Sequence, residues 1–228
     1  MLSRVVLVFC LGLTIGSYVL SRALAKRFPS PFTTPVFFST TFIIAVLCAA
    51  GVDYHEYEPA RDILIMLLGP ATVALAAPIY RNREILRSHI VPALAGILLG
   101  SLATVLVVVL VANAFHFSRE LTLSMSMKSV TAPIAIELAT LLKANPALAA
   151  AFVITTGMIG TMLGPWLLTR IGVVHPLARG LALGTISHGQ GTAQALSEGG
   201  LQGAIAGIAM GIAAVLTSIL LPWFTRFL

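Results

Sequence analysis

Charged side chains are scarce in this sequence, where Asp, Glu, Lys and Arg together make up 10% of 228 residues. A soluble globular domain carries about 25%, so this scarcity excludes a water-soluble fold. Apolar residues make up 58% of the chain, and the mean hydropathy is +0.99. Uncharged apolar runs approach the roughly 20 residues that a bilayer-spanning helix needs. The sequence therefore predicts an all-α polytopic membrane protein.

Enzyme signatures are also lacking. The two aspartates, Asp53 and Asp62, share one polar loop, far along the chain from Ser187 and His188. A Ser-His-Asp hydrolase would therefore lack its orienting acid. The sequence has no P-loop, no CxxC and no HExxH motif. We accordingly expect no enzyme activity, no catalytic residue, no metal and no cofactor.

Basic residues outnumber acidic ones by 14 to 8, but they occupy short loops. The stretches "SRALAKRF" and "YRNREILRSH" are basic, and the loop between them, "DYHEYEPARD", is acidic. This alternation is the positive-inside pattern, which predicts cytoplasmic basic loops and an external acidic loop and N-terminus. No basic stripe with interleaved aromatics occurs, which argues against nucleic-acid binding.

Six apolar runs are candidate spans of the lipid bilayer. No linker or low-complexity tract separates them, so we expect one membrane domain over residues 1–228. The spans are Val5–Ser21, Thr34–Val52, Ile63–Tyr80, Ile90–Phe115, Ala144–Thr169 and Gly199–Thr225.

Two further segments, Ser118–Asn145 and Leu177–Glu198, are too polar for plain spans. Each has an apolar arm, a small polar tip and a second arm. The charge rule favours two re-entrant hairpins that enter from opposite faces, and a pair of broken full-length helices is the alternative. Such pairing is compatible with an internal inverted repeat.

The polar tips of these segments are the candidate binding site. Irregular backbone at membrane depth survives only inside protein or beside a wet cavity. Helix N-termini that meet there attract anions. Gly189 and Gly191 are expected to make the sharp turn of the second tip. The candidate substrate-binding residues are Lys128, Ser129 and Thr131 in the first tip, and Ser187, His188, Gly189, Gln190, Gly191 and Thr192 in the second.

Four strings, "LLGPATVALAAPIY", "KSVTAPIA", "FVITTGMIGTMLGPWLL" and "ARGLALGTISHGQGTAQA", together resemble the LrgB/CidB family of bacterial membrane proteins, across roughly residues 3–225. The plastid glycolate/glycerate transporters carry a similar domain. The resemblance implies a multi-pass protein of the bacterial inner membrane that transports a small carboxylate such as glycolate, glycerate or pyruvate. The alternative that it implies is a holin/antiholin-like protein affecting murein hydrolase export and lysis. A small LrgA/CidA-type membrane protein is the implied partner.

The chain departs from the family pattern at the second tip. The family usually has a string like "ASHAxGTARA" where this chain has "ISHGQGTAQA", so Gln194 replaces a common arginine. Gly189 and Gln190 also differ from that pattern. If the arginine helps to hold an anion, this chain binds it more weakly or prefers another ligand.

Lys128 and His188 each have two interpretations. A lysine at the bilayer centre costs about 2.5–3.5 kcal/mol, which favours pairing between Lys128 and a substrate carboxylate. An ion pair with Glu137, or snorkelling to the interface, is the alternative. Glu137 is thus an ion-pair partner or a coupling carboxylate. His188 either donates to a carboxylate and exchanges protons, or bonds a backbone carbonyl to hold the turn.

Glycines recur at small-xxx-small spacing at Gly203, Gly207 and Gly211, and again at Gly96 and Gly100. We interpret these as close helix packing within the chain, with a homo-oligomer interface as the alternative.

Overall fold

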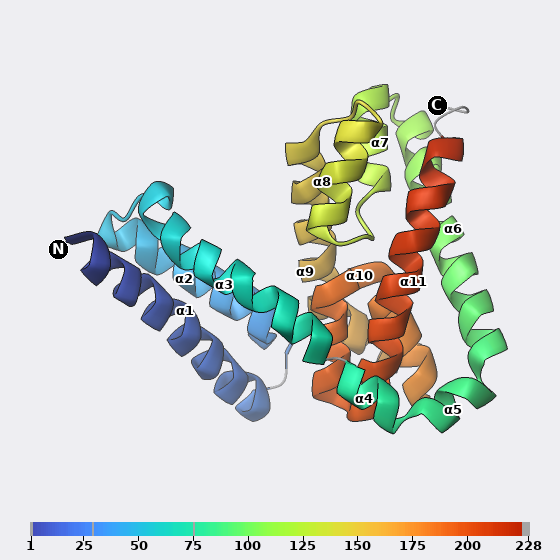
Figure 1. Cartoon of the computed structure of the whole chain (residues 1–228), viewed down its shortest axis with the longest axis horizontal. Helices are drawn as coiled ribbons and strands as arrows, with labels where there is room; N and C mark the ends of the chain where they lie inside the picture. Colours follow the sequence, from blue (N-terminus) through green and yellow to red (C-terminus); the bar gives the residue numbers. More distant parts are fainter. Residues whose placement is uncertain (1, 29, 75, 225–228) are drawn as a thin grey trace. The chain divides into compact units, whose positions relative to one another are not determined.

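The computed structural model describes residues 2–28, 30–74 and 76–224, and every regular element within them is a helix (Figure 1). The all-α prediction is confirmed. The chain forms two compact units, Met1–Leu75 and Ala76–Leu228. A single membrane domain over residues 1–228 stays a prediction.

The first unit contains three long helices and one short 3-10 turn. Helix α1 packs against both α2 and α3, and the hydroxyls of Thr14 and Tyr57 lie 3.0 Å apart across the α1–α3 contact. Gly51 ends α2 in the left-handed conformation, with φ of 64°. The elements are α1 (Leu2–Arg27), η1 (Pro31–Thr33), α2 (Pro35–Ala50) and α3 (Tyr54–Ala74).

The predicted spans of this unit differ in length from the helices found. Residues 4–27 form a helix long and apolar enough to cross a membrane. Helix α2 has 16 residues, or roughly 24 Å, less than the ~30 Å hydrocarbon core. The third predicted span is divided between α3 and α4 (Ala76–Arg81), and Leu75 between them lies outside the described residues.

The second unit contains the remaining helices, including three apolar helices of 25 residues, each roughly 38 Å long. Those three are α6 (Ile90–Ala114), α9 (Pro146–Arg170) and α11 (Gly200–Phe224), and the end of the last predicted span, Thr225, lies outside the described residues. The shorter elements are α5 (Arg83–Ser88), α7 (Arg119–Ser126), α8 (Ala132–Leu141) and the interrupted α10 (Pro176–Glu198).

One pattern of elements occurs twice in this unit. Helices α7 and α8 form a first hairpin, residues 118–145, which leads into α9. Helix α10 forms a second hairpin, residues 176–198, which leads into α11. Helices α9 and α11 run in opposite directions, and the turn of the first hairpin faces α10 (Figure 1). The repeated order of elements is compatible with an inverted repeat; the repeat itself and re-entry into a membrane stay predictions.

Short-range capping fixes the ends of the first hairpin. The Ser118 hydroxyl accepts from the Leu121 amide at 3.3 Å, and the Asn145 side chain accepts from the Ala147 and Leu148 amides at 3.0 and 3.1 Å. Both residues have the extended backbone of an N-cap. The hairpin therefore begins and ends where side chains satisfy orphan amides.

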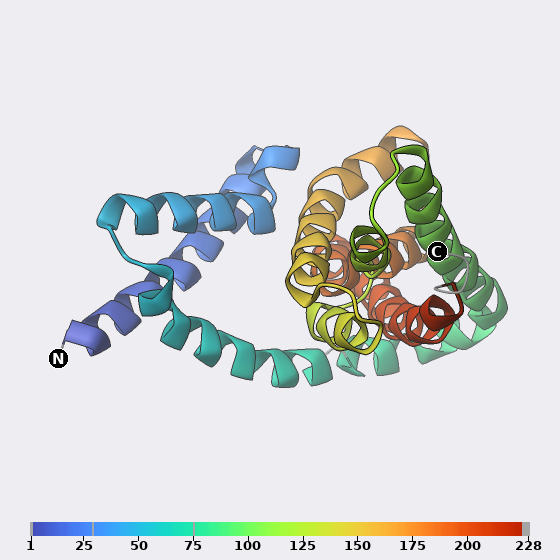
Figure 2. The ribbon, with the colours of Figure 1, turned by 90° about the horizontal axis from the view of Figure 1, so that it is seen from above.

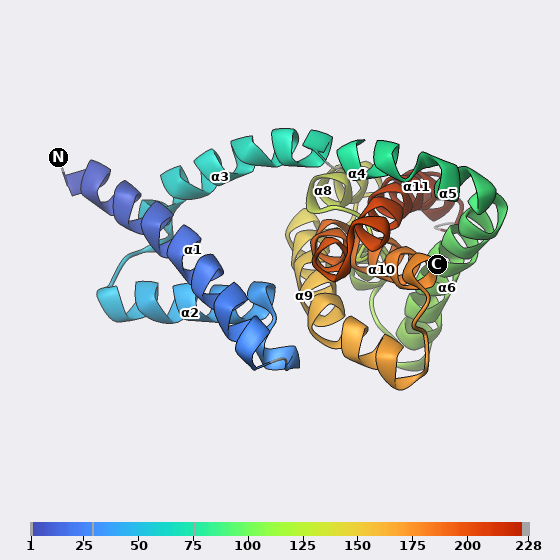
Figure 3. The same ribbon diagram turned by 90° about the horizontal axis from the view of Figure 1, so that it is seen from below.

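The second hairpin reverses at one residue, His188, whose φ of 43° and ψ of −130° interrupt α10. Beyond it, Gly191 lies directly against the carbonyl of Leu183. At the open end, Arg179 bonds Glu198 through two hydrogen bonds of 2.7 and 3.0 Å. Contacts at both levels hold the two arms side by side, and α10 packs between α9 and α11 (Figure 3).

Candidate functional site

The first tip, residues 127–131, joins α7 to α8 without a glycine. Met127 and Val130 anchor it, with 0% and 1% of their surface exposed. Between them, the half-buried Lys128 donates from Nζ to the Ser129 hydroxyl at 3.3 Å. The apolar anchors fix the turn, in which Ser129 is buried at 6% exposed while Lys128 and Thr131 are half-buried.

The N-terminus of α8 lies immediately after this tip. Thr131 is its N-cap, with φ of −75° and ψ of 151°, and no side chain caps the helix. Pro133, as expected, lies in the first turn and has no amide proton. Thr131 therefore does not cap the first amides of the helix with its side chain, and the helix dipole adds positive potential there.

Glu137 is exposed on α8, and it forms no ion pair with Lys128 among the described residues. The structure thus brings Lys128, Ser129 and Thr131 together but leaves Glu137 apart. A coupling role for Glu137 stays a prediction. The positive charge of Lys128 is not neutralised by a carboxylate of the described chain.

The second tip, residues 187–192, is held against α9 by His188. Its Nε2 bonds the carbonyl oxygen of Val153 at 3.0 Å, and 6% of the residue is exposed. A carbonyl only accepts, so Nε2 carries the proton. A positive φ at a non-glycine residue costs roughly 1–3 kcal/mol, and this buried bond helps to offset that cost. The geometry favours the structural interpretation of His188.

The other polar groups of the second tip have distinct environments. Thr192 donates to the His188 carbonyl at 2.9 Å, so its hydroxyl serves the turn. Ser187 is 1% exposed and lies against Gly160 of α9. The Gln190 side-chain oxygen is buried and has no hydrogen-bond partner in the described ranges. The Gln190 oxygen is thus a buried acceptor that the fold leaves without a donor in the described ranges.

The glycines of this tip do not have the expected role. The sequence predicts the sharp turn at Gly189 and Gly191, but the positive φ belongs to His188, and neither glycine has one. Gly191 is instead required by close approach, because a Cβ there would collide with the Leu183 carbonyl. At Gly189 the nearest heavy atom, the Met210 sulfur, would be 3.8 Å from a Cβ.

A row of glycines on α9 receives the second hairpin, and sequence reasoning did not assign it. A Cβ at Gly157 would be 2.8 Å from His188 Cε1 and 2.6 Å from the Gln190 oxygen. Gly160 and Gly164 face Ser187 and Leu183 in the same way. We call Gly157, Gly160 and Gly164 the glycine row. Their spacing of three and four residues was the available signal.

Val153 of α9 connects the two tips. Its side chain belongs to the buried cluster that contains Met127 and Val130 of the first tip. Its carbonyl accepts the hydrogen bond from His188 of the second. Seen from above, the first hairpin overlies α10 (Figure 2). The two tips therefore meet the same turn of α9 from opposite directions.

Among the other glycines with small-xxx-small spacing, some pack against a neighbouring helix and one has no close neighbour. Gly96 and Gly100 of α6 face Leu181 and Thr185 of α10 at 3.7 and 3.2 Å from a built Cβ. This contact agrees with close packing within the chain. Gly211 has no neighbour within 4 Å of such a Cβ. A homo-oligomer remains a prediction. The described residues contain no group of three His, Cys, Asp or Glu that could hold a metal.

Comparison with known proteins gives a family and its relatives. The family model described as the LrgB-like family matches residues 14–227. The chain is 38% identical over 210 residues to the Uncharacterized protein YxaC of Bacillus subtilis, covering 92% of this chain and 91% of that protein. It is 33% identical over 210 residues to the Holin-like protein CidB of Staphylococcus aureus, covering 92% of each. No solved structure matches.

Proposed function

The chain belongs to the LrgB-like family and is a multi-pass bacterial membrane protein, and from that premise we propose that it carries a small carboxylate across the membrane. One observation supports this most. The Lys128 ammonium lies beside the uncapped N-terminus of α8 and has no carboxylate partner among the described residues.

The first tip has donors suited to a carboxylate. Lys128 Nζ already donates to the Ser129 oxygen, so the Ser129 proton can be given to a ligand. One carboxylate oxygen would accept from Lys128 and the other from Ser129 or the first amides of α8. Charge-assisted bonds of this kind are about twice as strong as neutral ones. The same donors can bind the carboxylate of glycolate, glycerate or pyruvate.

The second tip closes this site from the opposite direction. Its imidazole and the Thr192 hydroxyl are engaged in the fold, so it supplies mainly a wall and the unsatisfied Gln190 oxygen. That oxygen suits a hydroxyl on the ligand, as in a 2-hydroxy acid. Inverted hairpins that meet at one helix favour alternating access over an open pore.

A second candidate function is holin-like activity, and a specific observation favours it. The Staphylococcus aureus relative is named a holin-like protein. The comparisons therefore support this candidate better than the carrier. In this case the chain would act by forming a pore or regulating lysis, with an LrgA/CidA-type partner.

Uptake into proteoliposomes separates these candidates. The purified full chain is reconstituted alone, and uptake of radiolabelled glycolate and pyruvate is compared with leakage of a trapped neutral dye. Saturable uptake that unlabelled carboxylate competes away supports the carrier. Dye leakage without saturation contradicts it and supports the pore. No uptake without an added LrgA/CidA-type protein, and uptake with it, would make this chain one subunit of a carrier.

A further inference from the structure

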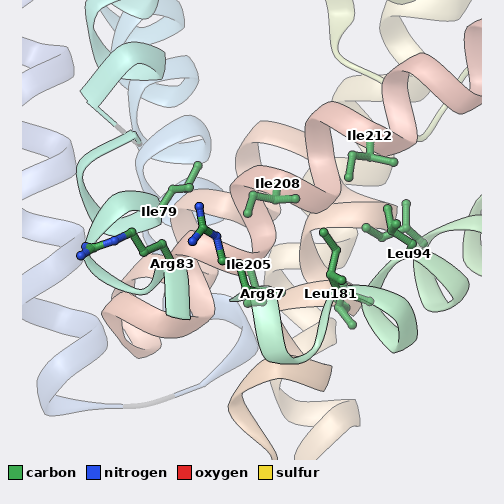
Figure 4. Close-up of a pocket in the computed structure, with 11 residues that line it drawn as sticks. Ile79, Arg83, Arg87, Leu94, Leu181, Ile205, Ile208 and Ile212 are labelled. Carbon is green, nitrogen blue, oxygen red and sulfur yellow. The ribbon is translucent and has the colours of Figure 1, made fainter. Parts of the chain in front are cut away.

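An apolar groove of about 240 Å³ lies in the second unit (Figure 4), and its lining residues include none from either tip. Helices α4, α5, α6, α10 and α11 all contribute to it. Its wall is aliphatic and includes Ile79, Ile90, Leu94, Leu181, Ile205 and Ile208. Ile90 and Leu94 are 52% and 43% exposed, so the groove opens onto the surface of the unit.

Two arginines from α5, Arg83 and Arg87, line the same groove (Figure 4). Arg83 stacks on the Tyr80 ring, with its guanidinium carbon 4.5 Å from the ring centroid, and donates to the Tyr80 carbonyl at 3.1 Å. Neither arginine forms an ion pair within the described part of the chain. Stacking orients one guanidinium while its charge remains available.

We propose that this groove binds an anionic phospholipid of the bilayer, with its phosphate at Arg83 and Arg87 and part of one acyl chain along the aliphatic wall. A guanidinium group binds phosphate in a bidentate manner, with two N–H groups donating to two phosphate oxygens. The segment that carries them is predicted to be cytoplasmic. On that side of the membrane, anionic lipid headgroups attract Lys and Arg side chains near the surface. The groove thus combines the two chemistries that a phospholipid presents together.

Other occupants fit less well. A soluble phosphate would satisfy the arginines but leave the aliphatic wall uncovered. A second copy related by twofold symmetry would place its own Arg83 and Arg87 near these, because such interfaces use the same patch twice. The like charges would repel. The positive charge of the two arginines therefore favours an anion, and the aliphatic wall of the groove favours an alkyl chain.

Lipid binding to the purified full chain tests the proposal. Native mass spectrometry with added phosphatidylglycerol or phosphatidylcholine would compare wild type with Arg83→Gln/Arg87→Gln. We expect phosphatidylglycerol to bind the wild type preferentially, and the double variant to bind it roughly tenfold more weakly. Ala93→Trp, which fills the groove and keeps both arginines, should also weaken binding. The matched control, Arg22→Gln/Lys26→Gln, removes two exposed cations from the other basic loop.

Four outcomes would overturn the proposal. An equal loss in the control variant would indicate general surface attraction. Equal binding of phosphatidylcholine would indicate an apolar groove without headgroup selection. Equally tight binding of glycerol 3-phosphate, which has no acyl chain, would indicate a soluble anion. Dimers in detergent that Ala93→Trp dissociates would identify a second copy as the occupant. Circular dichroism and gel filtration verify that each variant folds.

Discussion

The two hairpins of the second unit have the same order of elements but opposite chemistry at their tips. The first reverses over residues 127–131, without glycine, and carries the half-buried charge of Lys128. The second reverses at His188 alone and contains glycines and no Lys, Arg, Asp or Glu between residues 187 and 192. Both pack against α9. Similar packing against one helix therefore does not mean similar chemistry.

The difference lies in how the polar groups are used. In the second tip, the histidine and threonine bond the backbone, and serine lies against glycine. In the first tip, the Lys128 ammonium has no acidic partner and the Thr131 side chain makes no capping bond to α8, in the described ranges. Side-chain bonds to the backbone hold the second tip to the fold. The first tip, with its unpaired ammonium, is the better candidate for binding a ligand.

The largest effect is expected at the open end of the second hairpin. Arg179→Gln leaves Glu198 unpaired, and the side chains of this pair are 12% and 16% exposed. Breaking such a buried pair costs about 3 kcal/mol. Thermal unfolding in detergent measures the loss. Arg170→Gln, which removes an exposed arginine from the end of α9, is the control. Equal stability of the two variants would show that the Arg179–Glu198 pair does not hold the arms.

Alanine at each glycine of the second tip tests close approach. Gly191→Ala places a methyl group against the Leu183 carbonyl, and such overpacking costs about 1–3 kcal/mol. Gly189→Ala meets only the Met210 sulfur, at 3.8 Å, and should change little. The same unfolding assay compares them. Equal destabilisation by both would support the original expectation that both glycines form the turn.

A substitution in the first tip should lower carboxylate affinity without lowering thermal stability. Lys128→Met removes a charge-assisted contact worth about 1.5–3 kcal/mol, or tenfold to a hundredfold in carboxylate affinity. We expect no loss of thermal stability, because no ion pair is broken. Isothermal calorimetry with glycolate measures the affinity. Lys143→Met, at the open end of the same hairpin, should bind normally. A variant that binds normally but unfolds more easily would make Lys128 structural.

A smaller effect is expected at Thr192. Thr192→Val removes the hydrogen bond to the His188 carbonyl, worth about 1 kcal/mol. Its shape is conserved, so the unfolding temperature should fall slightly while carboxylate affinity stays the same. If affinity falls instead, the Thr192 hydroxyl contacts the ligand and the contrast between the tips is weaker than described.

The smallest effect is a gain. Gln194→Arg restores the charge that the family pattern carries on the second arm, where this side chain is half-buried. A partly solvated ion pair adds about 0.2–1 kcal/mol, so glycolate should bind up to about fivefold more tightly. Unchanged affinity for glycolate, glycerate and pyruvate would show that Gln194 does not set substrate preference.

Features written in local sequence were predictable. The bounds of the first hairpin agree with the N-caps Ser118 and Asn145, because capping depends on residues within one turn. The long spans after residue 90 agree with their apolar runs. The polar tips were found because their backbone must be buried in protein at membrane depth.

Features that depend on contacts between residues far apart in the sequence were not predictable. The sequence predicts a turn at the glycines, whereas the structure has it at His188. The positive φ of His188 is offset by a hydrogen bond to Val153, which lies 35 residues away, so no local pattern indicates it. The Arg179–Glu198 pair spans 19 residues, and no local pattern indicates it. Helix α2 is shorter than its apolar run because Gly51 ends it in the left-handed conformation.

The glycine row also fixes the position of the second hairpin along α9. Leu183, Ser187 and Gln190 face Gly164, Gly160 and Gly157 in turn. About one helical turn, or 5.4 Å, beyond the ends of the row lie Val153 and Leu168, which are not glycines. A slide of one turn would therefore press Gln190 or Leu183 against one of these side chains, and it would break the hydrogen bond from His188 to the Val153 carbonyl. The row thus selects a single register for the hairpin on α9.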